Sequence, residues 1–172
     1  MGPPWRSTPH TPGAVDAWIR REFTVRGLSP PDCTPEALAR ALERERYMTI
    51  EFRPHASTDP GVYGLLYRPA GCPDTSIIVY RPTHSIVLRR RILFHELAHI
   101  LFDHALTEVG GIGVLRGYMV SDKDDAMAEA FAVGATQYSF LDADPATAPA
   151  DAEDNVSASA FGQFLKRTQY KS

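Results

Sequence analysis

The segment at residues 94–104, FHELAHILFDH, places three histidines and a glutamate in an otherwise almost wholly apolar stretch. His95 and His99 are four residues apart, so on a helix they project from one face and can bind one metal ion. Glu96 would lie beside that ion as a general base. The alternative is a core helix whose polar groups all find partners, but burying this many titratable groups without an ion is costly. The pattern H-E-x-x-H therefore predicts a zinc (Zn2+) site with Glu96 as the catalytic residue.

A catalytic zinc site needs a third protein ligand and keeps its fourth position for water. The candidates are Asp103, His104, Asp125 and Glu129. His104 follows His99 by about 500° round a helix, so we expect it to point well away from the pair and to lie near the carbonyl dipole at the helix end. Asp125 and Glu129 share one helix face, so one can be the ligand while the other orients a ligating histidine.

Two segments together resemble the ImmA/IrrE family of metallopeptidases. The sequence RILFHELAHIL at residues 91–101 is similar to the family's H-E-x-x-H helix. The sequence DAMAEAFA at residues 125–132 is similar to a later family helix that supplies the third ligand, with Ala128, Phe131 and Ala132 at matching positions. The first segment is shared with all zincins, so the pairing of the two segments carries the resemblance.

The resemblance covers roughly residues 45–140 and implies a zincin-like fold, in which the histidine pair binds zinc and Glu96 is the base. The family's ligating glutamate falls on Asp125, which is one methylene shorter but is a residue type that binds zinc. Glu129 is then an outer partner that orients a histidine, or the ligand itself. On this reasoning Asp125 is the favoured third ligand.

We therefore expect a zinc-dependent endopeptidase that cleaves an intracellular protein. The resemblance implies a regulator as substrate, either a transcriptional repressor of the helix-turn-helix type or an antitoxin-like protein. The alternative is a non-proteolytic, zinc-containing interaction module of a phage or toxin–antitoxin type system. Glu96 favours the enzyme, because a structural zinc site has no need of a general base. The net charge of −3 and the lack of a helix-turn-helix pattern argue against direct binding of nucleic acid.

The elements that must position these residues follow from periodicity and turn signals. Helices are predicted at residues 14–26, 35–47, 89–104 and 122–138, with Thr34 as cap of the second and Asp122 or Asp124 as cap of the fourth, and strands at residues 49–53, 61–68 and 76–81. Residues 85–88 are either a further short strand or the lead-in to the third helix. Because the connections between strands are short, we expect an α+β fold with a small antiparallel sheet packed against the helices.

The length of 172 residues fits one domain with tails. We expect a disordered tail at residues 1–13, the metallopeptidase domain at 14–141, and a linker with a short C-terminal helix at 142–172. Cys33 and Cys72 form no C-x-x-C pair and are expected to be free thiols. Because the sequence has neither an apolar run of membrane-spanning length nor a signal peptide, we expect a cytoplasmic protein with no membrane partner.

Overall fold

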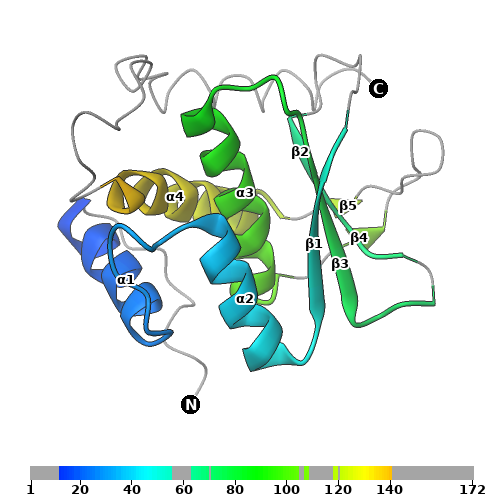
Figure 1. Ribbon diagram of the computed structural model, residues 1–172, viewed down its shortest axis with the longest axis horizontal. Helices are drawn as coiled ribbons and strands as arrows, with labels where there is room; N and C mark the ends of the chain where they lie inside the picture. The colour runs from blue at the N-terminus through cyan, green and yellow to red at the C-terminus, as the bar shows by residue number, and fades with distance from the viewer. Residues whose placement is uncertain are drawn as a thin grey trace.

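The computed structural model describes residues 12–55, 63–69, 71–104, 107–108, 118–119 and 121–140. In these residues the chain forms four helices and five strands (Figure 1). Their order is α1 (Pro12–Thr24), α2 (Pro35–Arg46), β1 (Thr49–Pro54), β2 (Gly64–Tyr67), β3 (Thr75–Tyr80), α3 (Ile86–Leu101), β4 (Thr107–Glu108), β5 (Tyr118–Met119) and α4 (Asp122–Ser139). The α+β class is confirmed, whereas the predicted tail, linker and C-terminal helix lie almost wholly outside the described residues.

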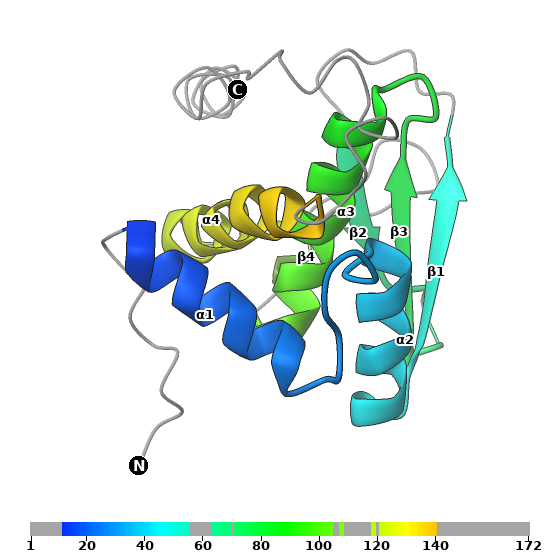
Figure 2. The ribbon, with the colours of Figure 1, turned by 60° about the vertical axis from the view of Figure 1, so that its left-hand side comes forward.

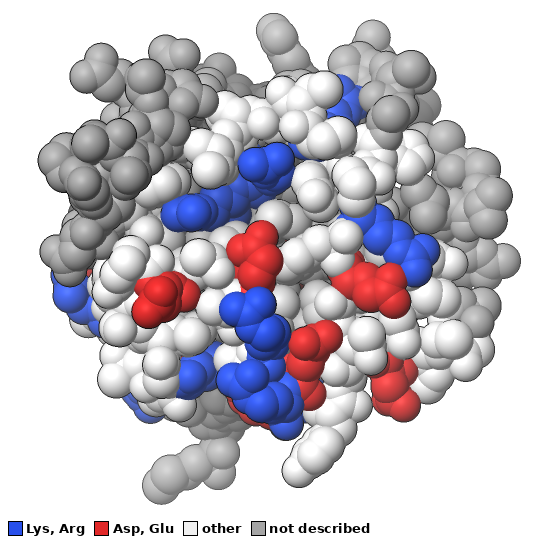
Figure 3. Space-filling model, viewed as in Figure 1, with Lys and Arg blue, Asp and Glu red and all other residues white. Residues whose placement is uncertain are grey.

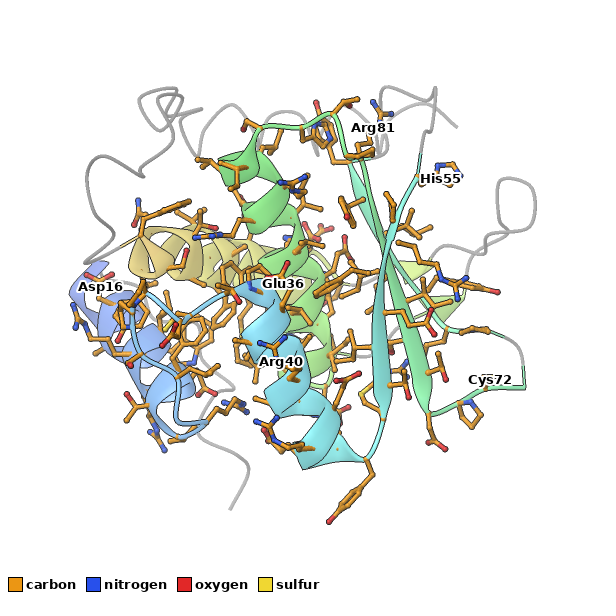
Figure 4. All side chains as sticks on the ribbon, viewed as in Figure 1. Asp16, Glu36, Arg40, His55, Cys72 and Arg81 are labelled. Atoms are coloured by element: carbon orange, nitrogen blue, oxygen red, sulfur yellow. The ribbon has the colours of Figure 1, made fainter. Side chains whose placement is uncertain are left out.

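The main sheet has the order β1-β3-β2, and the prediction that it is antiparallel is wrong for one of its two pairs. Strand β2 does pair antiparallel with β3, but β1 runs parallel to β3. His55 and Arg81, which directly follow β1 and β3, accordingly lie at the same end of the sheet (Figure 4). Strand β3 lies at the centre of the sheet, and four consecutive residues of it are buried, as is typical of a central strand. The shorter β2 lies at an edge.

The helices lie on one side of this sheet, as Figures 1 and 2 both show. Helix α3 packs against α4, α2 and the sheet, and α1 packs against α4. Three fully buried aromatic rings join α1, α3 and α4: Phe23 and Phe94 have centroids 5.9 Å apart, and Phe94 and Phe131 have centroids 6.4 Å apart. This aromatic cluster fixes how the two helices with the candidate ligands face each other.

Side-chain caps begin three of the helices. The Thr34 hydroxyl accepts a hydrogen bond from the Ala37 amide at the start of α2, as predicted. Ser85 caps α3, so residues 86–88 belong to that helix and not to a strand. Ser121 caps α4 through the amide of Asp124, in place of the predicted aspartate caps. The acidic residues of this first turn instead lie inside the helix, where they complement its dipole.

The surface shows mixed charge. On the face drawn in Figure 3, Lys and Arg side chains are interspersed with Asp and Glu, so neither sign dominates it. Cys33 is buried and Cys72 is exposed, and both are free thiols. No helix in the described part of the chain is long and apolar enough to cross a membrane.

Gly64, the first residue of β2, marks a tight contact between the edge of the sheet and α3. A Cβ atom at this position would lie 2.3 Å from Cγ2 of Ile92 and 3.3 Å from Oε1 of Glu96. Ile92 is buried and β-branched, so its side chain cannot move aside without repacking the core. Glycine at position 64 therefore lets β2 approach the helix that carries the H-E-x-x-H motif.

We expect Gly64→Ala to lower the free energy of unfolding by about 1–3 kcal/mol, because the added methyl group overpacks the contact with Ile92. Denaturant unfolding followed by circular dichroism measures this change. Gly13→Ala in α1 is the matched control, because a Cβ atom there would meet no atom within 4 Å and alanine favours a helix. A Gly64→Ala protein as stable as the Gly13→Ala protein would contradict the tight contact.

Candidate metal centre

Two facing helices bring the predicted ligands together. His95 and His99 lie one turn apart on α3, and Asp125 lies in the first turns of α4. Nε2 of His95 is 3.2 Å from Nε2 of His99 and 3.3 Å from Oδ1 of Asp125. The donor atoms of the three residues all lie within 4.8 Å of one another, so the group could hold a metal ion.

These separations fit the coordination shell of one ion. Two atoms bound tetrahedrally to one zinc, each at 2.0–2.1 Å, are about 3.3 Å apart. A single imidazole nitrogen offers either one proton or one lone pair, so Nε2 of His95 cannot make good hydrogen bonds to both of its neighbours. A shared cation would satisfy His95, His99 and Asp125 together. The donor set of two imidazoles and one carboxylate is also one that catalytic zinc sites use.

Glu129 lies on the other side of the His95 ring from this group. Its Oε2 is 3.2 Å from Nδ1 of His95, and its Oε1 accepts a hydrogen bond from Arg91. A hydrogen bond from Nδ1–H of His95 to this carboxylate leaves Nε2 free to bind a metal. The geometry therefore groups Asp125 with the histidine pair and places Glu129 at the other nitrogen of the His95 ring.

His104 does not point away from the pair as expected. Its Nδ1 lies 2.9 Å from Nδ1 of His99, and its side chain is only 3% exposed. The prediction assumed a helix continuing to residue 104, but α3 ends at Leu101 and Asp103 has a φ of 54° that turns the chain back. Burial lowers the pKa of His104, although the nearby Asp124 carboxylate opposes this. The Asp103 side chain is 82% exposed and pairs with Arg46, away from the ligand group.

Glu96 lies between the ligand group and the sheet. Its carboxylate accepts a hydrogen bond from the backbone amide of Leu66 in β2 and lies against Gly64. Burial raises the pKa of Glu96, and the positive charge of His95 and the Leu66 amide only partly offset this effect. The residue is therefore beside the ligand group, held by the edge strand, and more easily protonated than an exposed glutamate.

The carboxylates around His95 and His99 separate the pKa values of the two histidines. Burial alone lowers the pKa of His95, but hydrogen bonds to Asp125 and Glu129, with the charge of Glu96, outweigh it and raise this pKa to about 10. Burial, together with the positive charge on His95, lowers the pKa of His99 to about 3. In the absence of an ion the group therefore collects one proton at His95, and His99 stays neutral.

The charges next to His95 favour a divalent cation. Burial raises the pKa of Asp125, but the hydrogen bond and charge of His95 outweigh it, so the pKa is lowered and this carboxyl stays ionised. Glu96, Asp125 and Glu129 all interact with His95, and Arg91 pairs with Glu129. Three carboxylates and one guanidinium leave two negative charges when the histidines are neutral and all three carboxyls are ionised. A doubly charged ion at the common point of the ligands balances these charges.

Sequence reasoning missed two members of this arrangement. Arg91 lies four residues before His95 on α3, and that spacing alone could have indicated a shared outer partner for the two side chains. The contact of His104 with His99 depends on where α3 ends, which the sequence ILFD at residues 100–103 does not reveal.

Comparisons of the chain with protein-family models, with curated proteins and with solved structures gave no match in any of the three cases.

We expect the purified protein to bind about one zinc ion per chain, since the three donor atoms form one group of the size and type that a catalytic zinc ion uses. His95→Ala and His99→Ala should each lose most of this zinc, because each removes one of three ligands. Metal analysis after dialysis against a weak chelator measures the content. His55→Ala, which removes an exposed histidine at the end of β1, should keep it. Full zinc content in both site variants would exclude this site.

The roles of Asp125 and Glu129 make a separate prediction. Asp125→Ala should weaken zinc binding by more than about 100-fold, whereas Glu129→Gln should weaken it by about 10–100-fold, the usual cost of losing an outer partner. Competition with a coloured chelator measures both affinities. Asp122→Ala, at an exposed position in the same helix turn as Asp125, is the control and should bind as wild type does. A larger loss in the Glu129 variant than in the Asp125 variant would reverse the assignment.

Proposed function

We propose that the chain is a zinc-dependent metallo-endopeptidase of the ImmA/IrrE type. The observation that carries this proposal is the group formed by His95, His99 and Asp125, whose donor atoms lie within 4.8 Å of one another beside the half-buried Glu96. That combination supplies three ligands of the types that catalytic zinc uses and a neighbouring proton acceptor. The resemblance of residues 91–101 and 125–132 to the family adds the expectation of peptide-bond hydrolysis.

The catalytic roles follow from where each side chain lies. When bound, zinc supplies a Lewis acid that polarises a carbonyl and lowers the pKa of water. Glu96 takes the proton from the attacking water and then delivers it to the leaving amine. Burial raises the pKa of Glu96, which brings the carboxyl closer to the neutral range where one group can both accept and donate a proton. The Leu66 amide holds this carboxylate against the edge strand, so it stays oriented between the two transfers.

The half-buried position of Glu96 favours an enzyme over a non-proteolytic, zinc-containing interaction module. A structural metal site needs ligands and their outer partners, which His95, His99, Asp125 and Glu129 already supply. Glu96 is not in the ligand group, and the partial burial of its carboxyl disfavours the charged form, which raises its pKa. A proton-transfer role explains this placement.

The proposed substrate is an intracellular protein. Following the family resemblance, we propose a regulator, either a helix-turn-helix repressor or an antitoxin-like protein, and we place the reaction in the cytoplasm. The chain is proposed to act on this protein directly, without itself binding nucleic acid or a membrane. The mixed charge on the face in Figure 3 suits a protein partner better than a phosphate backbone.

We expect Glu96→Gln to lower the rate of peptide cleavage by about 10²–10⁴-fold, because the amide cannot accept the proton of the attacking water. Zinc affinity should stay near that of wild type, since Glu96 is outside the ligand group. Mass spectrometry of a protein-derived peptide library incubated with the zinc-loaded protein measures cleavage across many sequences at once, so the natural substrate need not be identified first.

Glu36→Gln is the matched control, because it makes the same chemical change at an exposed position of α2 (Figure 4). It should cleave as wild type does. Undiminished cleavage by the Glu96 variant would exclude Glu96 as the base. Zinc-loaded wild type that cleaves neither the library nor candidate regulators would favour the non-proteolytic module.

A further inference from the structure

The end of α3 places His104 against His99 through a defined backbone motif. The His104 amide donates to the carbonyl of His99, and the Asp103 amide donates to the carbonyl of Ile100. Because Asp103 has a left-handed backbone conformation, these bonds form a Schellman motif around the cap residue, Phe102. In this motif the second residue after the cap packs on the third residue before the cap. Those two positions are usually apolar, but here they are His104 and His99, with their Nδ1 atoms 2.9 Å apart.

Arg46 holds this turn from a neighbouring helix. Its Nη2 donates to the carbonyl of Leu101, one of the carbonyls that the end of α3 leaves without a helical partner. Its Nη1 lies 3.4 Å from the carboxylate of Asp103. The end of α2 therefore fixes the turn that carries His104, so the contact between the two histidine rings does not depend on a free loop.

We propose that His104 is a positioning residue for the metal-binding histidine His99. A distance of 2.9 Å between two nitrogens requires one of them to donate. If His99 donates from Nδ1–H, its Nε2 keeps a lone pair directed at Nε2 of His95 and the common point of the ligands. His104 is then the acceptor at Nδ1 and carries its own proton on Nε2. This inference rests on the proposed metal site.

The other ring nitrogen of His104 faces the start of α4. Nε2 of His104 is buried and has no hydrogen-bond partner among the described residues, and Oδ1 of Asp124 lies 3.8 Å from it. An N–H at this position is attracted to that carboxylate, which favours the tautomer that accepts from His99. The arrangement matches that of His95, where Glu129 is the acceptor, so each metal-binding histidine has its own acceptor behind it.

Two variants distinguish the effect of the hydrogen-bond acceptor of His104 from the effect of its ring volume. His104→Phe keeps a ring of similar size but has no acceptor, whereas His104→Asn places an amide oxygen near the position of Nδ1. Competition with a coloured chelator should show zinc affinity about 10–100-fold weaker for His104→Phe, and affinity close to wild type for His104→Asn. Thermal unfolding checks that both variants fold, and His55→Phe is the control for loss of a histidine outside the site.

Long-range 1H–15N NMR of zinc-loaded wild type tests the same inference without a mutation. We expect His99 to be protonated at Nδ1, and His104 to be protonated at Nε2 with a bare Nδ1. Zinc affinity in folded His104→Phe equal to that of wild type, or His104 protonated at Nδ1, would overturn the role of His104 and leave the metal site intact. Wild type that binds no zinc would overturn both this inference and the proposed function.

Discussion

The packing of α3 against α4 is the contact on which the candidate metal centre depends. Phe94 and Phe131 are fully buried and meet edge to face, and Phe23 of α1 packs against both rings. Phe94 directly precedes His95, and Phe131 follows Glu129 by two positions. The contact that fills the core therefore also sets the distance between the imidazoles of one helix and the carboxylates of the other, and the helices hold the site more rigidly than loops would.

Around this contact, each histidine of the pair has polar partners at its second ring nitrogen, on the side away from the ligand group. Glu129 and Arg91 lie behind His95, and His104 lies behind His99. Glu96 remains outside these pairs and is bound to the edge strand. Nε2 of His95 faces both Nε2 of His99 and Oδ1 of Asp125, and it can hydrogen-bond well to only one of them, whereas a shared cation would satisfy all three side chains together.

Local patterns in the sequence predicted the helices and the ligand face, because periodicity and capping act over a few residues. His95 and His99 share a face through their spacing alone, and Asp125 falls one turn before Glu129 for the same reason. The parallel pairing of β1 with β3 was missed, because the order of strands in a sheet depends on contacts between segments far apart in the sequence. The position of His104 was missed because a left-handed residue such as Asp103 is seldom visible in a sequence without glycine.

The proposed metal centre consists of one zinc ion bound by His95, His99 and Asp125. X-ray absorption at the zinc edge of the loaded protein tests this coordination, because it reports the atoms bound to the metal. We expect only nitrogen and oxygen neighbours at about 2.0–2.1 Å, with the multiple-scattering signal of two imidazole rings. Sulfur at about 2.3 Å, or the signal of fewer than two imidazoles, would contradict this coordination.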